Sequence, residues 1–247
     1  MMGNSKLKYS KETIYENIKI NDSTYKIVIK GDFSGVPGQF YMLRGWSNEP
    51  LLSRPISIHN LYEDRIEFMY QIVGEGTKVL SKLKIGDELE ITGPLGNGFD
   101  VDKINGKIAV VAGGIGTAPM CYLIKELKEK KITAYYGFRD NVYDLQEITD
   151  IVEEIKISTE NGSKGYKGYI TDIFKPELYD VVLCCGPEIM MNKVIEMCKD
   201  KNVSIYVTLE KHMACGIGAC LVCTCRTKSG NKRACKDGPV FNGLDLL

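Results

Sequence analysis

The sequence predicts a chain of the α/β plus all-β class, in which an N-terminal antiparallel β-barrel precedes a parallel α/β sheet and a small C-terminal segment. Three observations predict this division. Short alternating apolar runs occupy the chain from about Tyr9 to Gly98, longer apolar runs alternate with helical patterns after Asn105, and five of the nine cysteines lie within 215–235. We expect three units, formed by residues 1–103, 104–210 and 211–247.

The expected barrel rests on strand-length runs separated by turn residues. Apolar and polar side chains alternate within each run, and Gly, Pro, Asn and Asp stand between the runs. Many short strands at this spacing are typical of a closed barrel. The expected strands are 25–30, 39–44, 54–60, 65–73 and 88–93, with one short helix at 77–83.

The expected parallel sheet begins with KIAVVAGG (107–114), a continuous apolar strand that ends in glycines. Apolar residues at helical spacing follow it up to Leu127. Strands that alternate with helices in this way imply a parallel sheet with crossover helices. The other expected strands are 132–138, 154–159, 179–186 and 203–210, and a second helix carries Met190, Val194 and Met197 on one face.

Composition limits the partners and the location. Lys+Arg and Asp+Glu are equal at 32 each, which argues against nucleic acid as a partner because nucleic acid favours a basic face. No apolar run approaches the roughly 20 residues of a membrane span. The N-terminus lacks the apolar middle of a secretory signal. We therefore expect a soluble cytoplasmic protein with no membrane partner.

The spacing of the cysteines near the C-terminus predicts a plant-type [2Fe–2S] cluster. Cys215, Cys220 and Cys223 follow the pattern Cys-x4-Cys-x2-Cys, and Cys235 comes after eleven further residues. Two glycines between the first two cysteines allow a tight loop that turns backbone N–H groups toward the cluster. A segment with so few core-sized apolar residues also needs a metal site for its stability.

Structural zinc is the alternative for these thiolates. Zinc sites usually pair two Cys-x2-Cys knuckles, and only one such knuckle is present. We leave Cys225 out of the ligand set because its use in place of Cys223 would give an x4–x4 spacing. The other four cysteines lie in or beside apolar stretches, and three of them are expected to be plain core residues. They are Cys121, Cys184, Cys185 and Cys198.

Two barrel motifs predict a flavin dinucleotide site. RPIS (54–57) places an Arg that can clamp a pyrophosphate bidentately and a Ser that can bond the flavin ring. GEGT (74–77) precedes the short helix, so its N–H groups can hold the same pyrophosphate; an ordinary turn with a Thr cap is the alternative. The residues assigned to FAD are Arg54, Pro55, Ile56, Ser57, Gln71, Ile72, Val73, Gly76 and Thr77.

Two motifs of the α/β unit predict a site for a nicotinamide dinucleotide. GGIGTAP (113–119) joins a buried strand to a helix, although Pro119 stands where a dinucleotide fingerprint has its third glycine. CGP (185–187) ends a later strand, where ligands of such sheets bind. Cys185 either packs against the nicotinamide or is inert core, and we favour contact because Gly-Pro follows it. The residues assigned to NAD are Gly113, Gly114, Gly116, Thr117, Cys185, Gly186 and Pro187.

These motifs, in this order, resemble the ferredoxin-NADP reductase superfamily over nearly the whole chain. RPIS is similar to its Arg-x-Tyr/Ser-x-Ser flavin motif, with Ile56 in place of the usual Tyr, so one ring-stacking partner is lost. GGIGTAP and CGP are similar to its nicotinamide motifs. Within this superfamily, LEKHMACGIGACLVCTC, ACKDGPVF and GPLGNGF (93–99) resemble the electron-transfer subunits of type B dihydroorotate dehydrogenase.

The narrower resemblance implies a function. Such subunits bind FAD and a [2Fe–2S] cluster and relay electrons from the FMN of a catalytic subunit to NAD, in pyrimidine biosynthesis. The resemblance also implies a heterotetramer with two copies of each subunit. The charges of Arg139 and Asp140 after the second strand cancel and do not distinguish NAD from NADP, but the resemblance favours NAD. The flavin subunit of an NADH-dependent ferredoxin-NADP oxidoreductase, an oxygenase reductase and a zinc-stabilised binding module are the rival functions.

The chain offers no credible base for the oxidation of dihydroorotate, so we assign it no catalytic residue of that reaction. We expect dihydroorotate to be oxidised only when the catalytic subunit is present. Ile217, Leu221 and Val222 surround the cysteine ligands in a segment too small to bury them all. An exposed apolar rim of this kind is typical of a docking site for a partner.

Overall fold

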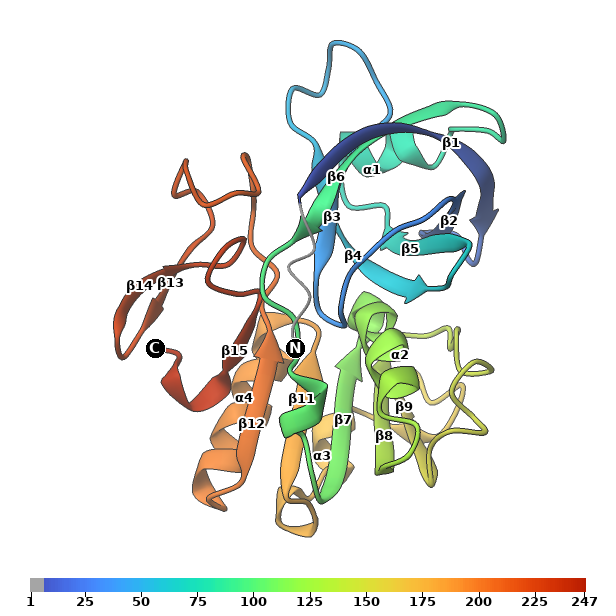
Figure 1. Cartoon of the computed structure of the whole chain (residues 1–247). Coiled ribbons are helices and arrows are strands. Elements are labelled where there is room, and N and C mark those ends of the chain that lie inside the picture. The colour runs from blue at the N-terminus through green and yellow to red at the C-terminus, as the bar shows by residue number, and fades with distance from the viewer. Residues whose placement is uncertain (1–6) are drawn as a thin grey trace.

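Six antiparallel strands close into a barrel in the N-terminal part of the chain (Figure 1). The computed structural model describes residues 7–247. Around the barrel the strands follow the order β1-β2-β5-β4-β3-β6, which confirms the expected closed barrel. The elements are β1 (Lys8–Lys19), β2 (Thr24–Lys30), β3 (Phe40–Arg44), β4 (Arg54–Leu61), β5 (Arg65–Gln71), α1 (Glu75–Leu80) and β6 (Glu88–Leu95).

Strand β1 is the barrel strand that alternation does not predict. Of its residues only Ile14 is buried, because polar side chains dominate both of its faces. One half of β1 pairs with β2 and the other half pairs with β6. Backbone hydrogen bonds rather than apolar side chains therefore close the barrel at this point.

Seven strands form the second sheet, in the order β10-β9-β8-β7-β11-β12-β15. It is parallel from β10 to β12, as the alternation of strands and helices predicts. The elements are η1 (Val101–Lys103), β7 (Lys107–Gly113), η2 (Gly114–Gly116), α2 (Thr117–Glu126), β8 (Lys131–Phe138), β9 (Glu154–Thr159), β10 (Tyr166–Lys167), α3 (Ile170–Ile173), η3 (Pro176–Leu178), β11 (Val181–Cys185), α4 (Glu188–Asp200) and β12 (Ser204–Thr208).

Burial on both faces explains the continuous apolar strands of this sheet. Ile108 and Val110 of β7 pack in the core that contains α2, whereas Ala109 and Val111 pack in the core that contains α4. Within residues 7–247, no helix is long and apolar enough to cross a lipid bilayer.

The C-terminal segment forms a hairpin and then adds a strand to the second sheet (Figure 1). Its elements are β13 (Thr224–Thr227), β14 (Gly230–Arg233), β15 (Val240–Asn242) and η4 (Gly243–Asp245). Strand β15 pairs antiparallel with β12, an addition that the alternating pattern does not predict. The segment expected to form the third unit is therefore joined to the second by backbone hydrogen bonds.

Helix α2 joins the barrel to the sheet and lies below the barrel in Figure 1. Most of its apolar residues face the sheet, but Tyr122 belongs to the core of the barrel. The Tyr122 hydroxyl donates a hydrogen bond of 3.2 Å to the carbonyl of Gly35. The start of α2 is thus held close to β4, the strand that begins with the predicted flavin motif.

Candidate cofactor sites

The loop that carries three of the predicted cluster ligands lies directly on the barrel. Gly216 has φ +71°, and a Cβ at this position would lie 3.0 Å from Cγ of Met42 and 3.1 Å from Cδ1 of Leu95. Glycine therefore satisfies both the backbone conformation and the close approach. Cys223 and Cys235 share a small hydrophobic core with side chains of β3 and β6; its other members are Phe40, Met42, Leu95, Ala234 and Met213.

Backbone N–H groups point at the sulfur atoms of this segment. The N–H of Gly218 donates to Sγ of Cys235 at 3.1 Å. The N–H of Cys220 donates to Sγ of Cys215, and that of Cys235 donates to Sγ of Cys223, both at 3.4 Å. Such bonds stabilise negative sulfur. Four thiols, three of which accept a backbone N–H, are a donor set that fits a [2Fe–2S] cluster.

The thiols of Cys215 and Cys235 differ in acidity. Burial opposes ionisation of Cys215, but hydrogen bonds from the backbone of Cys220, Ile217 and Ala219 outweigh burial and lower the pKa to about 6. Burial, followed by the neighbouring thiol of Cys223, raises the pKa of Cys235 to about 12. A metal must therefore displace a proton from Cys235, as metal binding to thiols generally requires.

Cys225, which we left out of the ligand set, lies in a different core. Its side chain packs in the hydrophobic core that contains α4, and its Sγ lies 3.6 Å from the carbonyl of Lys232. Burial raises its pKa. Cys225 therefore packs with the core of the second sheet rather than with Cys223 and Cys235.

A second contact ties the cluster segment to the barrel. The motif GPLGNGF, whose first residues end β6, meets the ACKDGPVF motif. The N–H of Asn97 donates to the carbonyl of Gly238, and its side-chain amide donates to the carbonyl of Lys236, at 2.6 and 2.9 Å. The two sequence motifs are thus in direct contact with each other.

The two predicted flavin motifs contact each other. Arg54 is half-buried at the start of β4, and its side chain crosses Gly76: a Cβ at Gly76 would lie 2.2 Å from Nε of Arg54. The guanidinium also donates to the carbonyl of Leu52 and lies 5.4 Å from the ring of Trp46. Burial lowers the pKa of Arg54. The structure therefore brings the Arg of one motif to the backbone of the other.

The other predicted flavin residues divide into exposed and structural groups. Val73 is 81% exposed. Ile56 packs in the barrel core and is only 8% exposed. The Thr77 hydroxyl accepts hydrogen bonds from the N–H groups of Val73 and Gly74, so it stabilises the start of α1 from within the first turn, whereas the N-cap residue is Gly74 and not the Thr of the alternative interpretation. Pro55, Ser57 and Ile72 are half-buried, and Gln71 is exposed.

The two predicted nicotinamide motifs also meet, because β7 and β11 are neighbours in the sheet. A Cβ at Gly116 would lie 2.4 Å from the carbonyl oxygen of Cys185, and a Cβ at Gly186 would lie 2.9 Å from the nitrogen of Gly113. Gly114 has φ +54°, and no heavy atom lies within 4 Å of its ideal Cβ position. An open backbone beside two closely packed glycine turns is suited to the approach of a dinucleotide.

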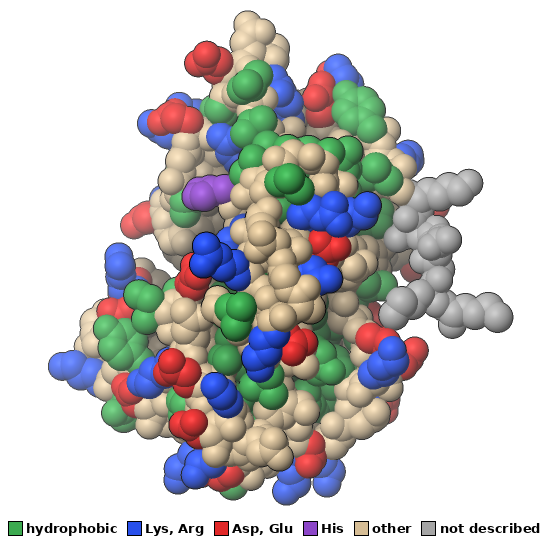
Figure 2. Space-filling view, turned by 90° about the vertical axis from the view of Figure 1, so that its left-hand side faces the viewer, with side chains coloured by type: hydrophobic (Ala, Val, Ile, Leu, Met, Phe, Trp, Pro, Cys, Tyr) green, Lys and Arg blue, Asp and Glu red, His purple; other side chains and the backbone are tan. Residues whose placement is uncertain are grey.

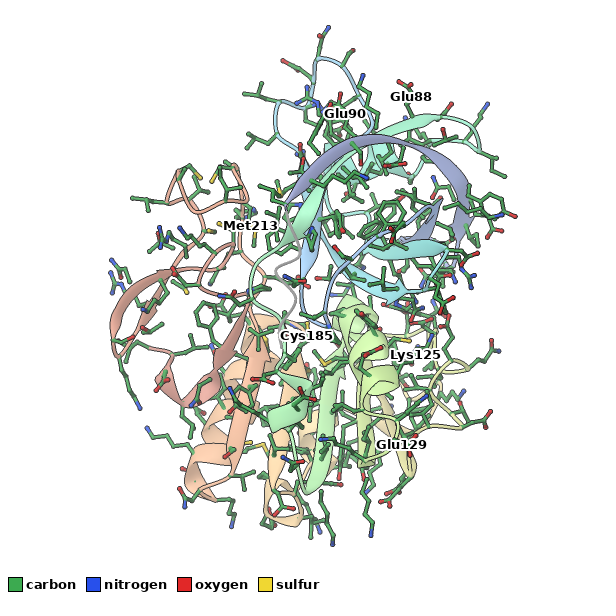
Figure 3. The ribbon with its side chains drawn as sticks, in the orientation of Figure 1. Glu88, Glu90, Lys125, Glu129, Cys185 and Met213 are labelled. Atoms are coloured by element: carbon green, nitrogen blue, oxygen red, sulfur yellow. The ribbon has the colours of Figure 1, made fainter. Side chains whose placement is uncertain are left out.

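The remaining members of this set are more enclosed. The Thr117 hydroxyl donates to the carbonyl of Gly114 at 2.9 Å, and Pro187 precedes α4. Cys185 has no exposed surface and belongs to the sheet core (Figure 3). A nicotinamide could touch this thiol only after a covering side chain moves.

Glu210 is a residue near this site that sequence reasoning did not select. It follows β12, and its carboxylate acts on Cys185, whose pKa burial and then Glu210 raise. Neighbouring protein atoms exclude water from part of the Glu210 carboxylate and so raise its pKa, although the residue as a whole is exposed. Its position after the carboxyl end of a sheet strand is the signal that could have identified it.

Comparison with known proteins identifies the family. Residues 210–247 match the model described as the iron-sulfur cluster binding domain of dihydroorotate dehydrogenase B. The electron transfer subunit of dihydroorotate dehydrogenase B (NAD(+)) from Clostridium acetobutylicum is 60% identical over 242 residues, which are 98% of each chain. The chain belongs to this family of electron transfer subunits. The same-named subunit from Clostridium perfringens is 51% identical over 244 residues, 97% of this chain and 98% of its own.

Solved structures confirm the reductase fold of this family member. The structure of an NADH-dependent reduced ferredoxin-NADP oxidoreductase matches all of this chain and 91% of its own, with a TM-score of 0.85 and 29% identity. An Amycolatopsis cytochrome P450 reductase matches 83% of this chain and 70% of its own, with a TM-score of 0.70 and 21% identity. The second likeness shows the fold alone.

Proposed function

We propose that the chain passes electrons from the FMN of a dihydroorotate dehydrogenase catalytic subunit through a [2Fe–2S] cluster and FAD to NAD. The observation that carries this proposal is the position of Phe40. It packs with Cys223 and Cys235, and its partner across the β3–β4 ladder is Ser57 of the predicted flavin motif. Phe40 therefore contacts the core of the cluster segment and is also paired with the strand assigned to the flavin.

The proposed ligands of the cluster are Cys215, Cys220, Cys223 and Cys235. When bound, the cluster exchanges single electrons, and FAD links these to the two-electron chemistry of NAD. The protein's part is to hold the thiolates with N–H donors and to keep the cluster against the barrel. The three units that we expect from the sequence then each hold one redox group: FAD at 1–103, NAD at 104–210 and the cluster at 211–247.

In the proposed flavin site, Arg54 binds the pyrophosphate, because a half-buried guanidinium that lies against the backbone of Gly76 can donate two parallel hydrogen bonds. Ser57 pairs across the β3–β4 ladder with Phe40, a member of the core that contains Cys223 and Cys235. At this position its hydroxyl can bond the flavin ring. Gln71, Ile72 and Val73 line the approach to Gly76. Ile56 and Thr77 contribute mainly through the backbone that they support.

In the proposed nicotinamide site, Gly113, Gly114 and Gly116 give the phosphates access to backbone N–H groups. Gly186 and Pro187 form the facing turn. Together the two turns orient the coenzyme across the carboxyl end of β7 and β11, below the barrel.

The name of the family, electron transfer subunits, implies a catalytic partner, and the surface around the cluster supports a docking site. Ile217, Leu221 and Val222 are 50%, 61% and 56% exposed. Figure 2, which views the molecule from the side of the C-terminal segment, shows hydrophobic side chains exposed among charges of both signs. We infer that the FMN-bearing subunit binds over this rim and that the complex contains two copies of each subunit.

Reconstitution tests the proposed function. The isolated holo-chain should reduce ferricyanide with NADH as the electron donor, and it should clearly prefer NADH to NADPH. It should not oxidise dihydroorotate. Addition of the catalytic subunit should produce dihydroorotate-dependent reduction of NAD. Turnover of dihydroorotate by the chain alone, or activity of the complex that survives removal of the cluster, would contradict the proposal.

A further inference from the structure

A buried group of polar side chains connects the flavin strand to the nicotinamide motif. His59 lies on β4, two residues after Ser57, and has no exposed surface. Its Nδ1 lies 3.0 Å from the carbonyl oxygen of Ala118, in the first turn of α2. A carbonyl oxygen can only accept, so Nδ1 carries the hydrogen of this bond. One imidazole thus spans the gap between strand and helix.

The opposite nitrogen of His59 faces carboxylates. Nε2 lies 3.5 Å from Oδ2 of Asp144 and 4.0 Å from Oε1 of Glu147, both on the segment between β8 and β9. Neither Nε2 nor Oδ2 of Asp144 has a hydrogen-bond partner within residues 7–247. Two buried acceptors that face each other repel unless a proton lies between them. A proton shared by His59 and Asp144 removes this repulsion and fixes the orientation of the ring.

The other charged groups around His59 pair with one another. Helix α2 contributes Cys121 and Lys125, and Figure 3 shows Lys125 on this helix. Lys125 contacts Glu147, Lys26 of β2 lies 3.4 Å from Glu67 of β5 and 3.8 Å from Glu147, and Arg65 lies 3.4 Å from Glu67. Among the described residues, His59 is the one basic side chain within 4 Å of the Asp144 carboxylate. Burial raises the pKa of Asp144 to about 6, although His59 opposes this rise.

We propose that His59 is a positioning residue for hydride transfer: it holds the start of α2, and with it the nicotinamide motif, at a set distance from the flavin strand. This inference rests on the proposed function. It follows from the chain connectivity, because His59 lies two residues after Ser57 of the flavin motif and Ala118 belongs to the nicotinamide motif GGIGTAP. Misplacement of reacting groups by about 1 Å can cost about 100-fold in rate.

A matched pair of substitutions in the full holo-chain tests the proposal. In His59→Asn, the amide nitrogen takes the place of Nδ1 and keeps the bond to Ala118. In His59→Gln, the longer amide reaches the place of Nε2 and loses that bond. We expect both variants to keep wild-type iron and FAD content and to lose some thermal stability. Only His59→Gln should slow the reduction of the bound FAD by NADH, by about 10- to 100-fold, and weaken the binding of NADH.

Equal losses in the two variants would overturn the positioning role, since a merely structural residue would not separate them. An unchanged rate in His59→Gln would overturn it as well. Failure of the wild-type chain to accept electrons from NADH would instead overturn the proposed function, and this inference with it. These results are distinguishable because the first two require an active wild type.

A spectroscopic readout is independent of turnover. The chain has two histidines, so ¹⁵N spectra of histidine-labelled holo-chain, with His212→Gln to assign the other signal, report directly on His59. We expect hydrogen on Nδ1. A neutral ring with hydrogen on Nε2 alone would overturn the proposal. So would one bound metal ion per chain beyond the cluster iron that is lost in His59→Gln, because a metal would then replace the shared proton.

Discussion

The cluster segment and the junction around His59 are two polar regions built in opposite ways. In the cluster segment, short loops direct N–H groups at thiols, and aliphatic side chains remain exposed. At the junction, partly or fully buried side chains from four elements and one loop pair their charges. The first region depends on a ligand for its stability, and the second depends on the packing of the barrel against the sheet. Substitutions in the two regions should therefore have different effects.

The largest expected effect is loss of the cluster. Replacement of Cys223 by Ser should remove iron and the visible absorbance of the cluster, because a buried thiolate ligand is lost. Cys225→Ser is the matched control, because Cys225 is only two residues away but lies in another core. Iron analysis and visible spectra measure the outcome. Loss of the cluster in the control, with retention in Cys223→Ser, would reverse our ligand assignment.

Removal of the Arg54 clamp should deplete the flavin. Loss of one partner of a buried, charge-assisted pair typically costs about 2–5 kcal/mol, so Arg54→Ala should purify with little FAD. Arg54→Lys keeps the charge without the planar fork and should retain an intermediate amount. The flavin released from each denatured protein gives the occupancy. Full occupancy in Arg54→Ala would show that other groups bind the pyrophosphate.

A charge on the apolar rim should weaken the complex without changing the subunit. Leu221→Glu should raise the Kd for the catalytic subunit about 10- to 100-fold, as expected for a residue near the centre of an interface. Ile85→Glu, another aliphatic residue that is 72% exposed, is the control and should bind normally. Titration calorimetry measures Kd, and NADH–ferricyanide activity of the isolated chain should not change. Equal binding of both variants would place the interface elsewhere.

The smallest expected effect is on the pH dependence of stability. The folded chain raises the pKa of Asp144 to about 6 by burial, so folding favours the protonated carboxyl and loses this contribution as pH rises through about 6. Asp144→Asn cannot titrate. Between about pH 5 and pH 7, the unfolding midpoint of the wild type should therefore change by about 2–6 °C relative to that of the variant, in the direction of lower stability at high pH. Parallel curves in thermal scans would contradict the assignment.

The comparison also explains what the sequence could predict. The barrel, the parallel strands and the family follow from local patterns, since each motif occupies fewer than twenty consecutive residues. Strand β1 has one buried residue, so its alternation is hidden. The junction around His59 brings His59 together with Ala118 and Asp144. These residues are far apart in the sequence, so no local spacing predicts their contact. Phe40 shows the same limit, because only the register of β3 on β4 places it opposite Ser57.

The antiparallel strand β15 has a consequence for how the chain is made. Without it, β12 would be an open edge beside the buried residues Ile205 and Val207, and such edges favour aggregation with other chains. Strand β15 thus protects the sheet, and it is joined covalently to the loop that carries Cys235. A polypeptide that stops before Val240 would lack that protection, so such copies should be cleared or precipitate rather than compete for the partner with copies that contain β15.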